Sequence, residues 1–105
     1  MVKLHKIKIL EEFADSVLFG DKTFEIRKND RGYQRGDLVR FIVMGKQDNT
    51  NVRNVYPCDR KPIEHPLNKE TYKITYVLNG WGLDMNMVAF SIVNVTGEMV
   101  GQKNE

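Results

Sequence analysis

The chain has 105 residues, of which 41% are hydrophobic and 29% charged, with 16 basic and 14 acidic side chains and a formal net charge of +2. This length suits one domain with a single core, the mild charge gives no argument for nucleic-acid binding from bulk electrostatics, and no apolar run approaches the ~18 residues that a membrane helix needs. Cys58, the single cysteine, excludes an internal disulfide and fits a reducing compartment, so we expect a cytoplasmic protein that does not use a membrane.

The first part of the chain predicts three strands and one helix. Residues 4–9 alternate between apolar and polar side chains, which is typical of a strand. Residues 11–19 begin with two glutamates, which the helix dipole favours, and Gly20 is well placed to end a short helix there. A second strand is expected over 23–28, and a third, rich in β-branched and aromatic residues, over 38–44.

The middle of the chain has a different character. Residues 45–70 contain all three prolines and few periodic apolar positions. We interpret this segment as a long loop or insertion, because long irregular segments in compact domains are usually functional or flexible.

The last part returns to strand patterns. Residues 71–78 alternate, and simple alternation puts Tyr72 and Tyr76 on one face, where we expect both to be core residues. Residues 87–95 are apolar on both faces, which predicts a central or covered strand. A single domain over residues 1–96 is therefore expected, followed by a flexible tail, and its five or six strands with one early helix suggest a small closed barrel of mixed α+β class.

The most informative segment is Gly20–Arg27. Alternation over 23–28 predicts that Phe24 and Ile26 point into a core, while the opposite face forms a polar wall with Lys22 at its entrance. That wall carries Thr23, Glu25 and Arg27. The same alternation is also typical of any half-exposed antiparallel strand, on which an ion pair contributes little stability.

The pattern Gly-x-Lys-x-x-Glu-x-Arg after a short helix, followed by the Gly36-Asp37 turn and an apolar strand, resembles ASCH-type domains of the PUA-like superfamily. More narrowly, residues 5–10, 22–31 and 74–78 resemble DUF3850, a family of small bacterial and phage proteins of unknown function. The resemblance covers most of residues 4–44 and 71–93. It implies a PUA-like β-barrel with a cleft lined by the Lys-Glu-Arg motif, and a role with RNA or modified nucleosides.

On this basis we expect a module that binds RNA or a modified nucleoside. Cationic side chains would contact phosphate or base, Glu25 would accept a hydrogen bond from an exocyclic amine, and an aromatic ring would stack on a base. The alternative for Trp81 is a side chain folded over the barrel end. The expected binding residues are Lys22, Thr23, Glu25, Arg27, Lys28, Arg31, Tyr33 and Trp81.

Two other functions stay open. One branch of the superfamily hydrolyses N4-acylated cytidine with a lysine-activated threonine, and Lys22 matches that lysine. Because Glu25 occupies the place of the threonine, this amidohydrolase activity is disfavoured, and Lys22 and Glu25 are its only catalytic candidates. The other alternative is a protein-interaction module, with strand 87–95 and loop 45–70 as a partner or homodimer surface. His5 and His65 stand in unlike contexts without a cysteine cluster, so we expect no metal site and no cofactor.

Overall fold

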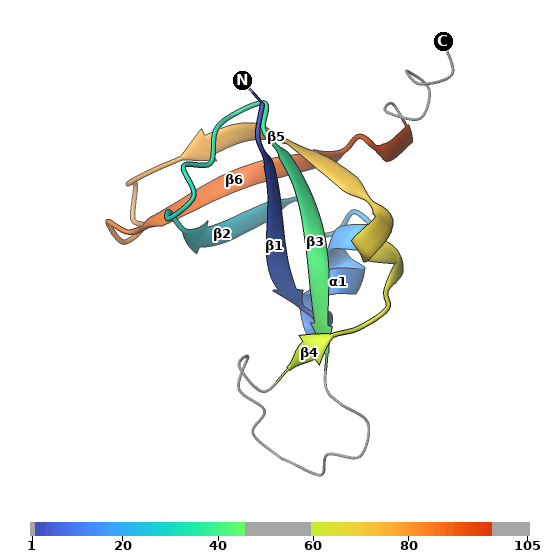
Figure 1. Cartoon of the computed structure of the whole chain (residues 1–105). Coiled ribbons are helices and arrows are strands. Elements are labelled where there is room, and N and C mark those ends of the chain that lie inside the picture. The colour runs from blue at the N-terminus through green and yellow to red at the C-terminus, as the bar shows by residue number, and fades with distance from the viewer. Residues whose placement is uncertain (1, 46–59, 98–105) are drawn as a thin grey trace.

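The computed structural model describes residues 2–45 and 60–97 of the chain (Figure 1). These residues form six strands, one α-helix and one short 3-10 helix. In chain order they are β1 (Leu4–Leu10), α1 (Glu11–Leu18), β2 (Phe24–Lys28), β3 (Leu38–Gly45), β4 (Lys61–Pro62), η2 (Pro66–Lys69), β5 (Thr71–Leu78) and β6 (Met87–Asn94).

The predicted elements outside the middle segment are confirmed to within one residue at each end. In the middle segment, residues 46–59 and the predicted tail beyond residue 97 lie outside the described residues. Residues 60–70 are more ordered than a long loop, since they contain β4 and η2. Leu67 is fully buried and Ile63 packs against the core, so two apolar side chains attach this stretch to the domain.

The sheet has the order β1-β3-β5-β6-β2, with β4 paired to the end of β3. β1 runs parallel to β3, and the remaining pairs are antiparallel. Figure 1 shows the sheet curling, with β5, β6 and β2 crossing away from β1 and β3. The expected closed barrel is therefore a half-barrel, because the edge strands β1 and β2 do not pair with each other.

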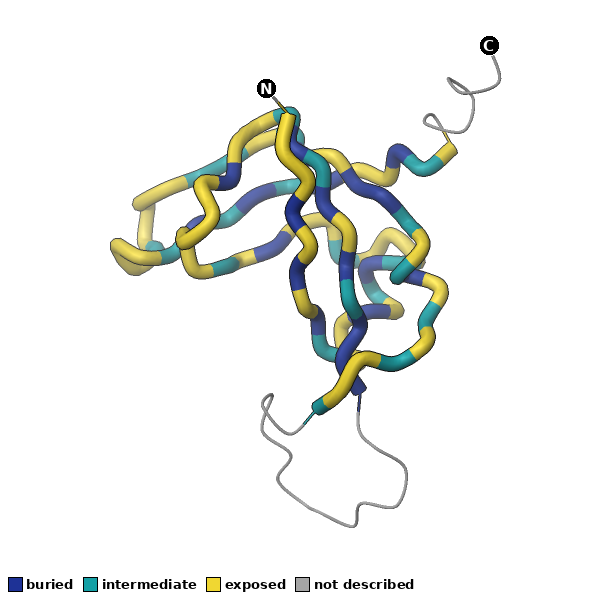
Figure 2. The backbone as a smooth tube through the Cα atoms, viewed as in Figure 1, coloured by how far each residue is buried: buried dark blue, intermediate teal, exposed yellow. Residues whose placement is uncertain are grey.

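The core fills the inner side of this curl, where alternate residues of every long strand are buried (Figure 2). α1 packs against β1, β3 and η2. It buries Ala14 and Val17 there. The largest fully buried side chains are Phe41, Phe90, Ile7, Leu67, Ile74, Val39, Val43 and Val88. β6 lies between β5 and β2, as its apolar sequence predicted.

β2 is turned the opposite way from the prediction. Phe24 and Ile26 are 48% and 49% exposed, whereas Glu25 is 3% exposed. The reason is the register with β6, in which Glu25 lies opposite Phe90. Residues directly opposite each other on antiparallel strands share a face. Because Phe90 must point into the core, Glu25 points there too.

β5 contains a second departure from simple alternation. Tyr72 is buried, as predicted, but Tyr76 is 61% exposed and the prediction of a core residue is wrong. The register shifts between Ile74 and Tyr76, so that Ile74 lies opposite Ile92 and Tyr76 opposite Ser91. This bulge at Thr75 inserts one extra residue and moves the following side chain to the other face.

Candidate functional site

A cleft of about 340 Å³ lies between the end of β1, the first turn of α1 and β2. It therefore sits at the seam where the two edge strands of the half-barrel face each other. Its charged side chains come from Lys8, Lys22, Glu25 and Arg27. Its apolar lining consists of Ile9, Leu10, Phe13, Phe24 and Ile26.

Glu25 is the buried anchor of this cleft. Its Oε1 accepts hydrogen bonds from Nε of Arg27 at 2.9 Å and from Nη2 at 2.7 Å. Its Oε2 accepts from Nζ of Lys22, and both cations form ion pairs with the carboxylate. A buried charge is costly unless it is paired and hydrogen-bonded, and here two cations satisfy both oxygens.

The turn after α1 places Lys22. The helix ends at Leu18, and Gly20 adopts a left-handed φ of 86°, which glycine reaches without steric cost. The N–H groups of Asp21 and Lys22 then both donate to the Ser16 carbonyl at 2.9 Å. Held this way, Lys22 reaches Glu25 and also donates to the Phe24 carbonyl at 2.8 Å.

Among the described residues, the cleft contains hydrogen-bond donors that no protein group accepts from. Because Nε and Nη2 of Arg27 share Oε1 of Glu25, the opposite edge of the guanidinium, which includes Nη1, has no acceptor among the described residues. That edge is a planar fork suited to two adjacent acceptor atoms. Because Lys8 and Lys22 also line the cleft, it contains three cationic side chains and one carboxylate. The arrangement therefore favours a ligand rich in acceptors or carrying negative charge.

Two basic side chains cover parts of the open seam. Nη1 of Arg31 donates to the Lys6 carbonyl on β1 at 2.7 Å. Nζ of Lys22 covers the Phe24 carbonyl on β2 in the same way. Edge strands expose unpaired backbone groups that invite further pairing, and positive side chains are one way to block it.

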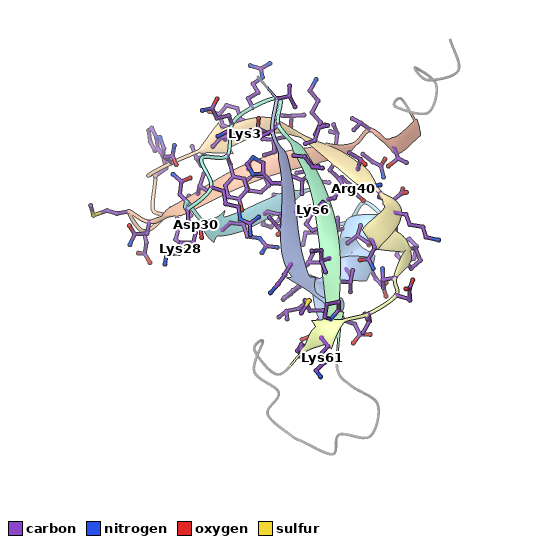
Figure 3. All side chains as sticks on the ribbon, in the orientation of Figure 1. Lys3, Lys6, Lys28, Asp30, Arg40 and Lys61 are labelled. Atoms are coloured by element: carbon purple, nitrogen blue, oxygen red, sulfur yellow. The ribbon has the colours of Figure 1, made fainter. Side chains whose placement is uncertain are left out.

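The structure brings Lys22, Glu25 and Arg27 together in the cleft, and none of the other expected binding residues is among those that line it. Thr23 is exposed, and its carbonyl accepts from the Ile92 N–H at 3.0 Å, which ties it to β6. Lys28 is exposed at the far end of β2, where Figure 3 labels it. Sequence reasoning missed Lys8 as a cleft residue, although its place on the alternating strand 4–9 offered a signal.

The two aromatic candidates have opposite environments. Tyr33 is buried, with its ring 4.7 Å from that of His5 and 4.7 Å from that of Phe90. Burial raises the pKa of the Tyr33 phenol above its usual range, against the lowering effect of Arg31. Trp81 is 89% exposed, so its ring is not folded over the barrel end. It adopts a left-handed φ of 53° in the turn between β5 and β6.

A second buried polar pair joins His5 to Asp37: a structural hydrogen-bonding role is the more common one for a histidine placed as His5 is on the first strand, but the sequence did not identify Asp37 as its partner. Nε2 of His5 lies 2.8 Å from Oδ2 of Asp37, and the backbone N–H groups of Lys3 and Gln34 also donate to this carboxylate. Burial alone would raise the pKa of Asp37, but these hydrogen bonds outweigh it and hold the pKa below its usual range. The pair ties β1 to the turn before β3 and is a structural element.

The geometry bears on the other expectations as well. Nζ of Lys22 is hydrogen-bonded to Glu25 and the Phe24 carbonyl, and no hydrogen bond to Thr23 is formed.

Within residues 2–45 and 60–97, no three histidine, cysteine, aspartate or glutamate side chains lie close enough to hold a metal ion. In the same residues, no helix has the length and hydropathy required to span a bilayer. Cys58 lies outside the described residues.

Comparison with known proteins identifies a family and a relative that are similar to this chain. The family model described as "Domain of unknown function (DUF3850)" matches residues 4–92. An uncharacterised 12.9 kDa protein in the GpA 3' region of Escherichia phage P2 is 49% identical over 39 residues, which cover 37% of this chain and 36% of the phage protein. The aligned part of the chain thus spans about a third of that relative.

Proposed function

The chain belongs to the DUF3850 family, and from this premise we propose that it binds RNA or a modified nucleoside in the cleft around Lys22, Glu25 and Arg27. The observation that carries the proposal is the free edge of the Arg27 guanidinium, held in place by buried Glu25. A fork fixed in this way is preorganised, so little conformational entropy is lost when a ligand binds.

The composition of the cleft favours a nucleobase over a simple anion. A base has an apolar ring face and a polar edge with adjacent acceptors, such as O6 and N7 of guanine. The cleft offers apolar walls from Phe13, Phe24 and Ile26 beside the fork of Arg27. Ligand sites of this kind usually combine mostly apolar walls with a few well-placed polar groups.

Glu25 adds selectivity in this proposal. Oε2 accepts one hydrogen bond, from Lys22, and has capacity for another. An exocyclic amine of a base can donate to it while an adjacent acceptor of the same base meets Arg27. We also propose, on the Lys-Glu-Arg motif and the curled sheet, that the fold is a PUA-like barrel of ASCH type and that the protein works in the cytoplasm.

Binding is favoured over amidohydrolase activity. A lysine that activates a threonine nucleophile must be hydrogen-bonded to it. Lys22 instead directs its ammonium group to Glu25 and to the Phe24 carbonyl. Both oxygens of Glu25 already accept from a cation, which favours a role in anchoring Arg27 and accepting from a ligand over that of a general base.

A thermal-unfolding screen tests the proposal with cytidine, N4-acetylcytidine, guanosine and short single-stranded RNAs as probes. A ligand that binds only the folded protein raises its free energy of unfolding by about 2.7 kcal/mol at a hundred times its Kd. Arg27→Lys keeps the charge but removes the fork, so it should abolish the stabilisation. Arg35→Lys, at an exposed arginine outside the cleft, is the matched control.

Two results would overturn the proposal. One is that no probe stabilises the protein. The other is that Arg27→Lys responds to every probe as the wild type does.

A further inference from the structure

The outer face of β5, β6 and β2 displays aromatic side chains. Tyr76 and Phe24 both pair with Ser91 of β6, from opposite sides, so the two rings flank this serine on one face. They are 61% and 48% exposed. Neighbouring strands lie about 4.8 Å apart, which puts the backbones of these two residues about 10 Å from each other.

The position of Tyr76 is the result of the bulge at Thr75. With regular alternation, Tyr76 would follow Tyr72 and Ile74 into the core. The bulge turns it outward, and the Thr75 hydroxyl lies 2.7 Å from the Ser91 hydroxyl, a contact that ties the bulge to β6. Bulges commonly redirect a side chain next to a functional site. Here the fold gives up the burial of a large aromatic ring.

The exposed charges on the strands themselves are of one sign. Lys73 is exposed, pairs with Val93 on β6 and has no ion-pair partner among the described residues. The strands β1, β3, β5 and β6 contain no aspartate or glutamate at all, and the one carboxylate of β2 is buried Glu25. On β1 and β3, Lys6 and Arg40 lie directly opposite each other, and both are labelled in Figure 3.

We propose that this outer face, called here the platform and consisting of Phe24, Lys73, Tyr76 and Val93, binds single-stranded RNA. Bases stack on Tyr76 and Phe24, and Lys73 contacts the phosphate backbone. Single-stranded nucleic acids are held in this way, by aromatic stacking beside cationic groups. The inference rests on the proposed function in one respect, namely that the ligand class is RNA.

The platform also connects to the cleft. Phe24 lines the cleft and belongs to the platform as well, and Nζ of Lys22 lies 5.1 Å from the centre of its ring. A base held in the cleft by Arg27 therefore has a stacking surface next to it. A strand that places one nucleotide in the cleft continues over Phe24 toward Tyr76.

Charge argues against a second copy of the chain as the occupant. In a two-fold symmetric dimer the same patch meets itself. Lys73 would then face a surface whose strands offer no exposed carboxylate. A polyanion complements the platform, whereas a second platform does not.

The test measures binding of a fluorescently labelled single-stranded RNA of about ten nucleotides, within the site sizes known for such surfaces. Tyr76→Ala should weaken binding about five- to 150-fold, the range expected for loss of one base stack. Tyr76→Phe keeps the ring and should bind as the wild type does. The same sequence as a duplex should compete poorly, because its bases are stacked within the helix.

A matched lysine pair tests the backbone contact. Lys73→Ser should weaken binding and reduce the slope of log Kd against log salt by about 0.7, the contribution of one phosphate contact to a single strand. Lys61→Ser, on exposed β4 at the other end of β3, removes the same charge elsewhere and should leave the slope unchanged (Figure 3).

The platform inference fails if Tyr76→Ala binds the RNA as tightly as the wild type, or if Lys73→Ser and Lys61→Ser behave alike. It also fails if the duplex competes as well as the single strand, or if sedimentation shows a dimer that Tyr76→Ala dissociates while RNA binding persists. The cleft proposal is separate, because Arg27→Lys should abolish nucleoside stabilisation, on which Tyr76→Ala has no effect. Loss of one response without the other tells which proposal is wrong.

Discussion

Glu25 lies directly opposite Phe90 across the β2–β6 ladder, and the two side chains are 3% and 2% exposed. A carboxylate thus has a core phenylalanine as its cross-strand neighbour. This is tolerable because Arg27 and Lys22 supply three hydrogen bonds to it. The cleft and the core therefore share a wall, and substitutions in one should affect the other.

Glu25→Gln should lower the free energy of unfolding by about 1–3 kcal/mol. The change leaves Arg27 and Lys22 without a counter-charge, but each is about a quarter exposed, so the cost stays below the ~3–5 kcal/mol of a fully buried pair. Urea unfolding measures it, with Glu64→Gln at an exposed glutamate as the control. An unchanged unfolding free energy for Glu25→Gln would show that the ion pairs contribute no stability.

A pair of isoleucines tests which face of β2 points outward. Ile26→Ala should cost about 1 kcal/mol or less, because Ile26 is 49% exposed. Ile74→Ala removes a fully buried side chain from β5 and should cost about 2–5 kcal/mol. Chemical denaturation of both variants measures the two losses in the free energy of unfolding. Equal losses in the free energy of unfolding would show that Ile26 points into the core, as alternation first suggested.

The His5–Asp37 pair should make stability depend on acid pH. Because the pKa of Asp37 is lowered in the folded protein, its stabilising contribution is complete above the ordinary aspartate value of about 4. That contribution is lost as the pH falls from there through the lowered pKa. Asp37→Asn has no such titration, so its stability deficit relative to the wild type should shrink below pH ~4. A deficit that is constant from pH ~6 to pH ~2 would contradict this assignment.

Arg31→Gln tests whether the Arg31 side chain stabilises the edge strand β1. It removes the hydrogen bond to the Lys6 carbonyl and should cost about 0.5–1.5 kcal/mol, near the lower end because the bond is exposed to water. Arg35→Gln provides the control at an exposed arginine four positions along the chain. Unfolding curves that coincide for the two variants would leave Arg31 without a structural role.

The sequence pattern grouped the side chains of β2 correctly but assigned the two groups to the wrong sides. Alternation states that Glu25 and Arg27 share a face, since that follows from strand geometry alone. Which face is inside depends on the register with β6, a strand far away in the chain. Hydrophobicity favoured burying Phe24 and Ile26. The observed orientation, with Glu25 buried instead, is stable only because Glu25 is paired with two cations.

Tyr76 and Leu67 illustrate two further limits. The bulge at Thr75 adds one residue to β5, and no glycine marks it in the sequence. Alternation therefore predicted the wrong face for Tyr76. Leu67 stands among prolines and polar residues in a segment without periodicity, yet η2 buries it completely. A single buried contact leaves no repeating pattern from which to predict it.

The position of β2 at the edge of the sheet has a consequence for the order in which the chain acquires its structure. The described residues that line the cleft all lie within the first 27 positions, but the backbone partner of β2 is β6, near the other end. Such distant pairings form slowly, because the entropy of closing a long loop is lost before the contact is gained. During synthesis, Glu25 and Arg27 leave the ribosome long before Phe90 and Val88 exist to align them. The cleft is therefore completed only when the last strand joins the sheet, and ligand binding reports on the folding of the whole domain.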